Sequence, residues 1–233
     1  MAFTFTPCRI EGLWEIQPAL FDDARGYTVT SYSEREFFAA GLTMRFVQDN
    51  QSASKGGVLR GLHWQTLHPQ GKLVRAVVGS IYDVAVDLRN GSKSFGCYHG
   101  SLLDATKQNQ LYIPPGFAHG FYVLSDYAVC SYKCTDFYHP EDEAGLCWND
   151  STLAIDWQAT GAFAGASGGA AATAFTPLLN EKDSRHPAFD PSRAYFDLNG
   201  VWRGGDWRTV AGTVTNARNS SDDSVATNGG GVQ

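Results

Sequence analysis

Short apolar runs separated by turn residues fill the chain from residue 46 to residue 137. This spacing is typical of a β-sandwich or β-barrel. The clearest runs flank Gly79-Ser80, a glycine-first pair suited to a two-residue type II′ turn. The pattern therefore predicts a mainly β protein with a hairpin over residues 72–89, in which Val78 lies opposite Ile81.

One face of this expected hairpin carries charge. Period-2 alternation places Lys72, Asp83 and Asp87 together, while apolar side chains dominate the other face. A solvated outer face accounts for this pattern, and a barrel with a polar ligand cavity inside accounts for it equally well. The hairpin alone leaves both explanations open.

One short helix interrupts the strand pattern. Ser33 followed by Glu36 resembles a capping box, the next residues tolerate a helix, and Gly41 can end it. We therefore expect a helix over residues 34–40.

The composition changes towards the end of the chain. Residues 159–174 are almost entirely Ala, Gly, Ser and Thr, which indicates a flexible insertion. Residues 212–233 are rich in Ser, Asn, Thr, Asp and Gly, which is typical of a disordered tail. These features predict one domain over residues 1–190 that contains the insertion, followed by a C-terminal extension over residues 191–211.

The overall composition excludes several classes of protein. A length of 233 residues suits one substantial domain. No apolar run approaches the roughly 20 residues that span a bilayer, and the N-terminus has no signal-peptide pattern, so we expect a cytoplasmic protein without a membrane partner. A net charge of -6 without a basic run argues against nucleic acid as a partner. A small anionic ligand stays possible if arginines gather in a cleft.

The five cysteines are scattered and show no paired CxxC spacing. This argues against a disulfide scaffold and against a zinc knot. We expect free, buried thiols.

Two motifs in the middle of the chain resemble those of cupin β-barrels. Pro114-x-Gly116-x-x-His119 resembles the second cupin motif, and Gly57 followed six residues later by His63 resembles the start of the first. The resemblance implies a double-stranded β-helix, or jelly-roll, barrel with a few short helices.

The ligands that bind a metal in most cupins are not all present here. Such sites use two histidines and a carboxylate of the first motif, but Gln65 replaces the second histidine, and Pro69 and Gln70 stand where the carboxylate would fall. The ammonium of Lys72 nearby would repel a cation, so we expect no metal. The side chains that remain are suited to proton transfer. His63 titrates near neutrality and can act as a general base if a carboxylate orients it.

A more specific resemblance extends over residues 8–158. Successive segments are similar, in the same order, to motifs of the dTDP-4-dehydrorhamnose 3,5-epimerase family. These segments are 21–26 (FDDARG), 46–50 (FVQDN), 58–63 (VLRGLH), 70–75 (QGKLVR), 83–87 (DVAVD), 113–121 (IPPGFAHGF) and 132–133 (YK).

The family resemblance implies a reaction and its catalytic residues. Members convert dTDP-4-keto-6-deoxyglucose to the 4-keto-rhamnose isomer without a cofactor. By this resemblance His63 removes the C3 and C5 protons, Tyr132 returns a proton to the opposite face, and Lys72 stabilises the enolate oxygen, as a fixed ammonium in a dry pocket can. The carboxylate that orients His63 matches Asp183, with Asp83 as the alternative.

The same resemblance implies how the nucleotide is bound. Arg25 and Arg60 suit the diphosphate because a guanidinium binds phosphate oxygens in a bidentate manner. The segment of Arg25 can reach a neighbouring subunit's site in the family, which implies a homodimer. The further substrate-binding candidates are Gln48, Tyr27 as a stacking partner of the base, Tyr138, Lys182, and His119, which is otherwise a buried structural histidine.

Three alternatives stay open from the sequence. An enzyme that inverts only C3 or C5, or a ketoisomerase, would share the barrel and the basic histidine. A metal-dependent cupin would need the site that Gln65 and Lys72 argue against. A non-catalytic sugar-binding cupin would show no turnover that depends on His63.

Overall fold

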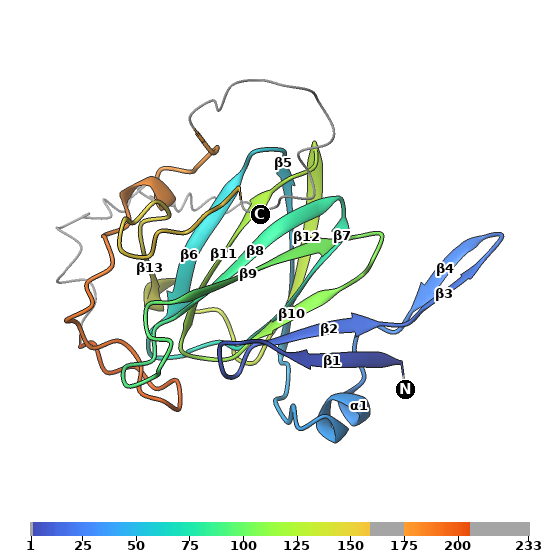
Figure 1. The fold of residues 1–233 in the computed structure, drawn as a ribbon, viewed down its shortest axis with the longest axis horizontal. Coiled ribbons are helices and arrows are strands. Elements are labelled where there is room, and N and C mark those ends of the chain that lie inside the picture. The colour runs from blue at the N-terminus through green and yellow to red at the C-terminus, as the bar shows by residue number, and fades with distance from the viewer. Residues whose placement is uncertain (1, 159–174, 206–233) are drawn as a thin grey trace, which may run out of the picture.

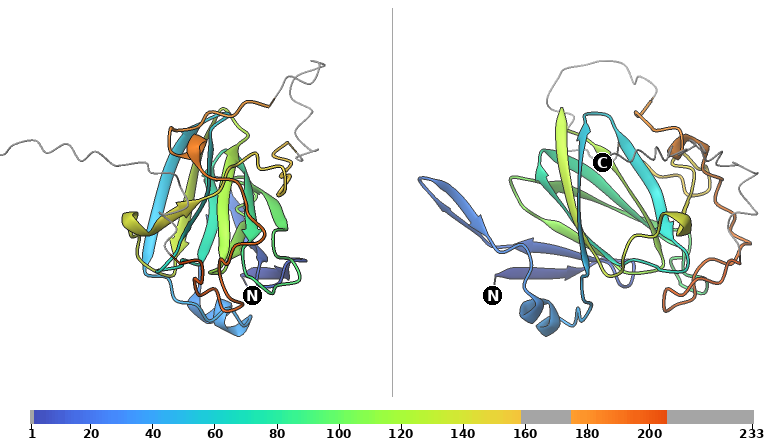
Figure 2. Two further views of the ribbon diagram at one scale, coloured as in Figure 1. Left: turned by 90° about the vertical axis from the view of Figure 1, so that its left-hand side faces the viewer. Right: turned by 180° about the vertical axis from the view of Figure 1, so that it is seen from behind.

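The computed structural model describes residues 2–158 and 175–205, which form a mainly β jelly-roll barrel of the cupin type (Figure 1). The insertion expected over residues 159–174 and the tail expected over residues 212–233 lie outside the described residues. Two antiparallel sheets form the barrel, and the hairpin of residues 20–29 projects from it when the molecule is seen from behind (Figure 2).

The larger sheet has six strands in the order β1-β2-β10-β7-β12-β5. Their bounds are Phe3–Pro7 (β1), Trp14–Pro18 (β2), Gln110–Ile113 (β10), Lys72–Val78 (β7), Tyr127–Cys134 (β12) and Gln48–Lys55 (β5).

The smaller sheet has five strands in the order β13-β6-β11-β8-β9. Their bounds are Glu143–Gly145 (β13), Leu59–Gln65 (β6), Phe117–Val123 (β11), Ser80–Asp87 (β8) and Tyr98–Asp104 (β9). A separate hairpin of β3 (Leu20–Asp23) and β4 (Gly26–Val29) extends away from the barrel (Figure 1).

The hairpin expected over residues 72–89 is wrong. β7 pairs with β10 and β12, whereas β8 pairs with β9 and β11 in the other sheet. Gly79 does adopt a positive φ of 68°, but the chain uses it to cross between the sheets rather than to turn back. Turn chemistry is a local signal, and here the partners that flank each strand override it.

The barrel interior is filled from both sheets. Its cluster of buried side chains includes Val74 and Ala76 of β7, Ile81 and Ala85 of β8, and Phe121 of β11. Alternate residues of β8 therefore point inwards, and the intervening Tyr82, Val84 and Val86 belong to a second cluster on its outer side. Because both faces are covered, every residue of β8 is buried.

The charged face expected on this strand lies inside the protein. Asp83 and Asp87 are both fully buried. Asp83 is hydrogen-bonded to His119, and Asp87 accepts hydrogen bonds from the Arg89 guanidinium at 2.8–2.9 Å. The solvated outer face is thus the wrong explanation, and Asp87 is part of a structural ion pair.

The expected helix is present as α1 (Glu34–Ala39), with Ser33 as its N-cap residue. The side-chain bonds of a capping box do not form, and the Glu36 carboxylate instead accepts a hydrogen bond from the backbone N–H of Ala2. Gly41 ends the helix with φ 86°, in a Schellman pattern in which Leu42 N–H donates to the Phe37 carbonyl. None of the helices in the described residues is long and apolar enough to cross a membrane.

The segment over residues 175–205 covers the outer face of the five-stranded sheet. Phe189, Tyr195 and Phe196 are buried there against Trp64 and Leu88. This segment also contains the short 3₁₀ helix η2 (Asp183–Arg185), which lies against β6. The other 3₁₀ helix, η1 (Pro140–Asp142), directly precedes β13.

Candidate active site

A cavity of about 320 Å³ opens between the two sheets. Its lining joins β5, β6, β7, β12 and β13 and consists of Asn50, His63, Trp64, Gln65, Gln70, Lys72, Tyr132, Tyr138 and Glu143. Another hollow of similar volume, about 330 Å³, lies along β5, β7, β10 and β12. No histidine lines that second hollow, so we assign the proton-transfer chemistry to the cavity with His63.

His63 is paired with a buried carboxylate. Its Nε2 lies 2.7 Å from Asp183 Oδ1, and Asp183 Oδ2 accepts a hydrogen bond from the Gly61 backbone N–H at 3.3 Å. The Asn180 side chain accepts the Asp183 N–H and so fixes the turn that presents this carboxylate. Asp183 is the partner of His63, whereas Asp83 contacts His119.

The ionisation of Asp183 determines which nitrogen of His63 is basic. Burial alone would raise the pKa of Asp183, but its interactions with His186 and His63 outweigh that cost and hold the pKa below its usual range. An ionised carboxylate can only accept hydrogen bonds, so Nε2 carries the proton and Nδ1 keeps its lone pair. Burial lowers the pKa of His63, against the effect of Asp183, which favours the neutral base.

A second carboxylate, Glu143, lies on the other side of the imidazole. Its Oε1 is 3.5 Å from His63 Nδ1. Its Oε2 accepts hydrogen bonds from the Tyr138 hydroxyl at 2.7 Å and from Lys182 Nζ at 2.6 Å. Burial would raise the pKa of Glu143, but His63 and Lys182 together hold it below the usual value. An imidazolium formed at His63 would therefore be flanked by two negative charges.

Tyr132 and Lys72 face His63 from the opposite sheet. They come from β12 and β7 of the six-stranded sheet, while His63 comes from β6 of the five-stranded sheet. Lys72 Nζ lies 5.9 Å from the centre of the Tyr132 ring. Burial is the main cause that raises the pKa of Tyr132 to about 12, so its hydroxyl keeps its proton at neutral pH.

Three of the expected substrate-binding residues lie at or beside the cavity. Tyr138 lines it from the segment that follows β12, which ends at Cys134. Gln48 accepts a hydrogen bond from the Tyr138 backbone N–H at 3.0 Å. Lys182 is joined to the site through Glu143.

Arg60 and His119 are close by but do not line the cavity. Arg60 donates a hydrogen bond to the Ser54 hydroxyl at 3.0 Å, and its positive charge lowers the pKa of Tyr132 against the larger effect of burial. His119 is buried, and its Nε2 lies 2.8 Å from Asp83 Oδ1. Of its two expected roles, this geometry matches the buried structural histidine.

Arg25 and Tyr27 are not brought to the cavity of their own chain. They lie on the hairpin of β3 and β4, which points away from the barrel (Figure 1). The Arg25 side chain is 89% exposed and pairs with Asp23, while Tyr27 is 50% exposed and its hydroxyl accepts a hydrogen bond from Gln108.

Sequence reasoning missed Glu143 and His186. Glu143 lies on a three-residue strand after a polar turn, where a carboxylate usually faces solvent, so no sequence signal marked it. His186 Nε2 lies 3.7 Å from Asp183 Oδ1, and the plane of its ring is inclined at 73° to that of His63. Its position three residues after Asp183 is the signal that could have identified it.

Two groups of metal-ligand type are present among the described residues. His63, Asp183 and His186 have ligand atoms within 4.8 Å of one another, and so do Cys8, Glu15 and His99. In the first group Asp183 Oδ1 already lies close to both imidazoles, at 2.7 Å from His63 Nε2 and 3.7 Å from His186 Nε2. The second group lies outside the cavity described above.

The comparisons with known proteins agree with this geometry. The family model of dTDP-4-dehydrorhamnose 3,5-epimerase matches residues 7–191. The enzyme of that name from Pseudomonas aeruginosa is 49% identical over 174 residues, which is 74% of this chain and 88% of the relative. The crystal structure of dTDP-6-deoxy-D-glucose-3,5-epimerase from Legionella pneumophila in complex with dTDP-4-keto-L-rhamnose is 41% identical, with a TM-score of 0.72 over 80% of this chain and 92% of that one.

A neighbour with a narrower activity is also similar. A 3'-monoepimerase from Streptomyces bikiniensis in complex with dTDP-quinovose is 29% identical, with a TM-score of 0.67 over 78% of this chain and 86% of that one. The match of the family model over most of the chain, together with relatives near 50% identity, establishes the family. This chain therefore belongs to the dTDP-4-dehydrorhamnose 3,5-epimerase family.

Proposed function

We propose that the chain is a cofactor-independent isomerase that inverts C3 and C5 of dTDP-4-keto-6-deoxyglucose. The observation that carries the proposal is a single cavity with His63 on one wall and Tyr132 and Lys72 on the other. Inversion requires a base and an acid on opposite sides of the sugar ring, because a lone base returns the proton to the face from which it came.

Proton abstraction is the first step. His63 Nδ1 takes the proton from C3 or C5, and the electron pair of the C–H bond moves towards the C4 oxygen to form an enolate. Asp183 holds the ring through Nε2, and Glu143 at 3.5 Å from Nδ1 stabilises the imidazolium. The two carboxylates thus lower the free energy of the charged intermediate state.

Lys72 stabilises the enolate oxygen at C4. The protons next to a ketone become acidic only if the developing oxyanion is stabilised, and a fixed ammonium supplies this in a pocket with few waters. The negative charge that forms at the C4 oxygen is paired with the Lys72 ammonium. The total charge of the site does not change, because the proton that leaves the carbon stays on His63.

Reprotonation completes each inversion. The Tyr132 hydroxyl gives its proton to the same carbon from the opposite face, which leaves a phenolate there and an imidazolium at His63. Both groups then exchange protons with solvent before the second carbon reacts. The elevated pKa of Tyr132 keeps the hydroxyl protonated until the enolate forms.

Substrate binding uses the polar rim of the cavity. Arg60 would bind the diphosphate, with Gln48 at the nucleotide and Lys182 and Tyr138 beside the sugar. His119 would act on the sugar only indirectly, since its Nε2 is occupied by Asp83.

Replacing the base tests the proposal. We expect His63→Ala to lower turnover of dTDP-4-keto-6-deoxyglucose by about 10²–10⁴-fold, the typical cost of losing a general base, with substrate affinity largely kept. Turnover measured by proton NMR and binding measured by calorimetry separate the two effects. Turnover at the wild-type rate in this variant would contradict the proposal.

A second candidate is an enzyme that inverts one carbon only, or a ketoisomerase on the same class of substrate. The likeness to the 3'-monoepimerase favours it, since that neighbour shares the fold. Reaction in deuterated water separates the candidates. Solvent deuterium at both C3 and C5 of the product supports the double epimerase, and deuterium at one carbon supports the single-site enzyme.

A homodimer would give Arg25 and Tyr27 a function. Their hairpin extends from the barrel with Phe21 62% exposed and Tyr27 50% exposed, which suits insertion into a second copy. In such a dimer Arg25 would complete the diphosphate site of the partner subunit.

Complementation tests this arrangement. Arg25→Ala and His63→Ala are each expected to be weakly active, but a mixed dimer of the two variants contains one intact site. Co-refolding equal amounts of the two variants should therefore restore about a quarter of wild-type turnover. Random pairing makes about half of the dimers mixed, and one of the two sites in each mixed dimer is intact. Absence of recovery in a mixture that light scattering shows to be dimeric would contradict the exchange of Arg25.

A further inference from the structure

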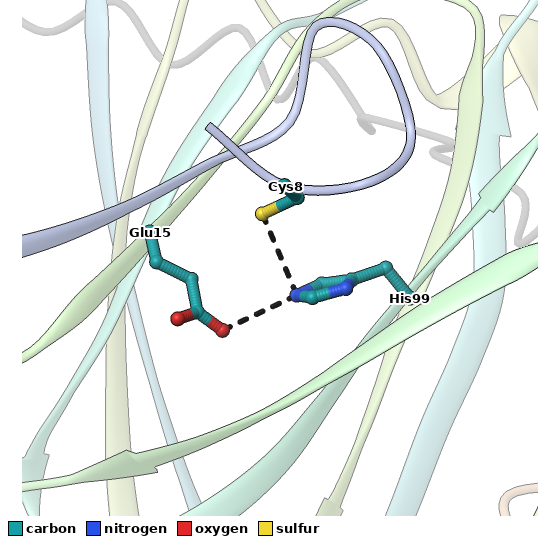
Figure 3. Close-up of side chains that lie close together, drawn as sticks. All are labelled: Cys8, Glu15 and His99. Atoms are coloured by element: carbon teal, nitrogen blue, oxygen red, sulfur yellow. Dashed lines mark hydrogen bonds and ion pairs between the residues drawn. The ribbon is translucent and has the colours of Figure 1, made fainter. Parts of the chain in front are cut away.

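We propose that Cys8, Glu15 and His99 form a binding site for a divalent transition-metal ion of the zinc class, separate from the catalytic cavity. Figure 3 shows the Cys8 sulfur and the Glu15 carboxylate each pointing to the same ring nitrogen of His99, which is Nε2. Their ligand atoms lie within 4.8 Å of one another. Thiolate, imidazole and carboxylate are the ligand types that Zn²⁺ uses, and three protein ligands leave a fourth position for water.

The observed spacings fit a tetrahedral ion. With ordinary zinc bond lengths, tetrahedral angles separate a thiolate sulfur from an imidazole nitrogen by about 3.6 Å, and that nitrogen from a carboxylate oxygen by about 3.4 Å. Cys8 Sγ lies 3.6 Å from His99 Nε2, and Glu15 Oε1 lies 3.3 Å from the same nitrogen. Small side-chain movements would complete the site, since Glu15 is 49% exposed and free to adjust.

The three ligands come from both sheets. Cys8 lies in the turn that follows β1, where its N–H donates to the Leu13 carbonyl, and Glu15 lies on β2. His99 lies on β9, the edge strand of the other sheet. A bound ion would therefore link the two sheets at this edge of the barrel.

The surroundings support ion binding at this place. The Ser101 hydroxyl donates a hydrogen bond to Glu15 Oε1 at 3.1 Å, as the outer partners of metal-ligating carboxylates do. The His99 side chain is 23% exposed, which leaves a path for the ion. On binding, the Cys8 thiol gives its proton to solvent and the neutral imidazole coordinates through Nε2, so the thiolate and the carboxylate balance the charge of the ion.

Cobalt titration of the full-length protein tests the site. Co²⁺ bound to a thiolate gives a sulfur-to-metal charge-transfer absorption, and the group of His63, Asp183 and His186 contains no sulfur. We expect one equivalent of Co²⁺ to give this absorption and Zn²⁺ to abolish it by displacement. Cys8→Ser should remove the absorption, while Cys97→Ser, which changes an exposed cysteine that is not a member of the group, should keep it.

Two further variants separate coordination from folding. Glu15→Gln changes a half-exposed side chain and should weaken Co²⁺ binding, and Ser101→Ala should weaken it by about 10–100-fold through loss of the outer hydrogen bond. Zn²⁺ should raise the melting temperature of the wild type and of Cys97→Ser but not of Cys8→Ser. No charge-transfer absorption in the wild type, or one that survives Cys8→Ser, would overturn the proposal and leave a hydrogen-bonded trio only.

Discussion

His63 lies between two carboxylates that interact with it to different degrees. Asp183 is 1% exposed and bonded to Nε2 at 2.7 Å, whereas Glu143 lies 3.5 Å from Nδ1 and shares its charge with Lys182 and Tyr138. The closer carboxylate fixes the orientation and the tautomer of the ring. The more distant one leaves Nδ1 free to take a proton and then stabilises the product of that transfer.

The pH dependence of kcat/KM reports on this arrangement. Burial lowers the pKa of His63 below the ordinary value of 6.5, and the base must be neutral to act. We therefore expect activity to fall on the acid side with a midpoint below pH 6.5. Glu143→Gln should move this midpoint lower still, because Glu143 raises the pKa of His63.

Glu141→Gln is the matched control, since Glu141 is exposed and pairs with His139 instead. It should leave the midpoint unchanged.

The free energy of unfolding should also fall on the acid side. As the pH falls from 6.5 towards the pKa of His63 in the folded state, the unfolded chain binds a proton that the folded chain does not, and stability is lost. An acid midpoint above 6.5 would contradict a buried, neutral His63.

At the scale of elements, the close approach of β6 and β11 positions the catalytic histidine. Gly61 has φ 120°, and a Cβ added there would lie 2.5 Å from the Gly120 Cα and 2.8 Å from the His119 carbonyl oxygen. Both contacts are with backbone, which cannot move aside without separating the strands. Gly61 also donates its N–H to Asp183, so this contact supports the site directly.

Substitution of Gly61 should therefore lower the free energy of unfolding by more than backbone strain alone would. We expect Gly61→Ala to destabilise the fold by about 3 kcal/mol or more, because a strained φ and overpacking each contribute. Gly41→Ala, at φ 86° with open space around it, should cost only about 1–2 kcal/mol. Urea unfolding compares the two, and equal losses would show that the contact with β11 does not matter.

The sequence allowed prediction of elements where the signal was local. Ser33 and Gly41 marked α1 because caps depend on neighbouring residues. The pairing across Gly79-Ser80 failed because the partners of β7 and β8 come from distant segments. Sheet pairing depends on the whole barrel, and a turn motif carries no information about it.

The same distinction explains which parts of the site were found. His63, Lys72 and Tyr132 lie in motifs that could be recognised along the chain, and they line one cavity. Glu143 could not be found, because its burial results from the pairing of β13 with β6. The group of Cys8, Glu15 and His99 has no motif spacing, since the fold alone brings its members together.

At the scale of the whole molecule, the C-terminal segment completes the core. Tyr195 and Phe196 are at most 1% exposed and cover the outer side of β6, β8 and β11, although the expected domain ended at residue 190. The barrel without this cover would expose a large apolar face to solvent.

Two truncations test the role of this segment. Deletion of residues 189–233 should yield aggregated or unfolded protein, because the apolar outer face of the five-stranded sheet loses its cover. Deletion of residues 212–233, whose composition predicts a disordered tail, should leave the melting temperature and turnover unchanged. A soluble, active product of the longer deletion, judged by chromatography and turnover, would contradict the structural role of Tyr195 and Phe196.

The most direct test of the account compares exchange with inversion in Tyr132→Phe. His63 alone can remove and return a proton on one face, whereas inversion also needs the Tyr132 hydroxyl on the other wall of the cavity. Proton NMR in deuterated water should therefore show solvent deuterium entering the sugar next to the keto group while formation of the inverted product falls by about 10²-fold or more. Equal loss of exchange and inversion, or unchanged inversion, would contradict the assignment of base and acid to opposite walls.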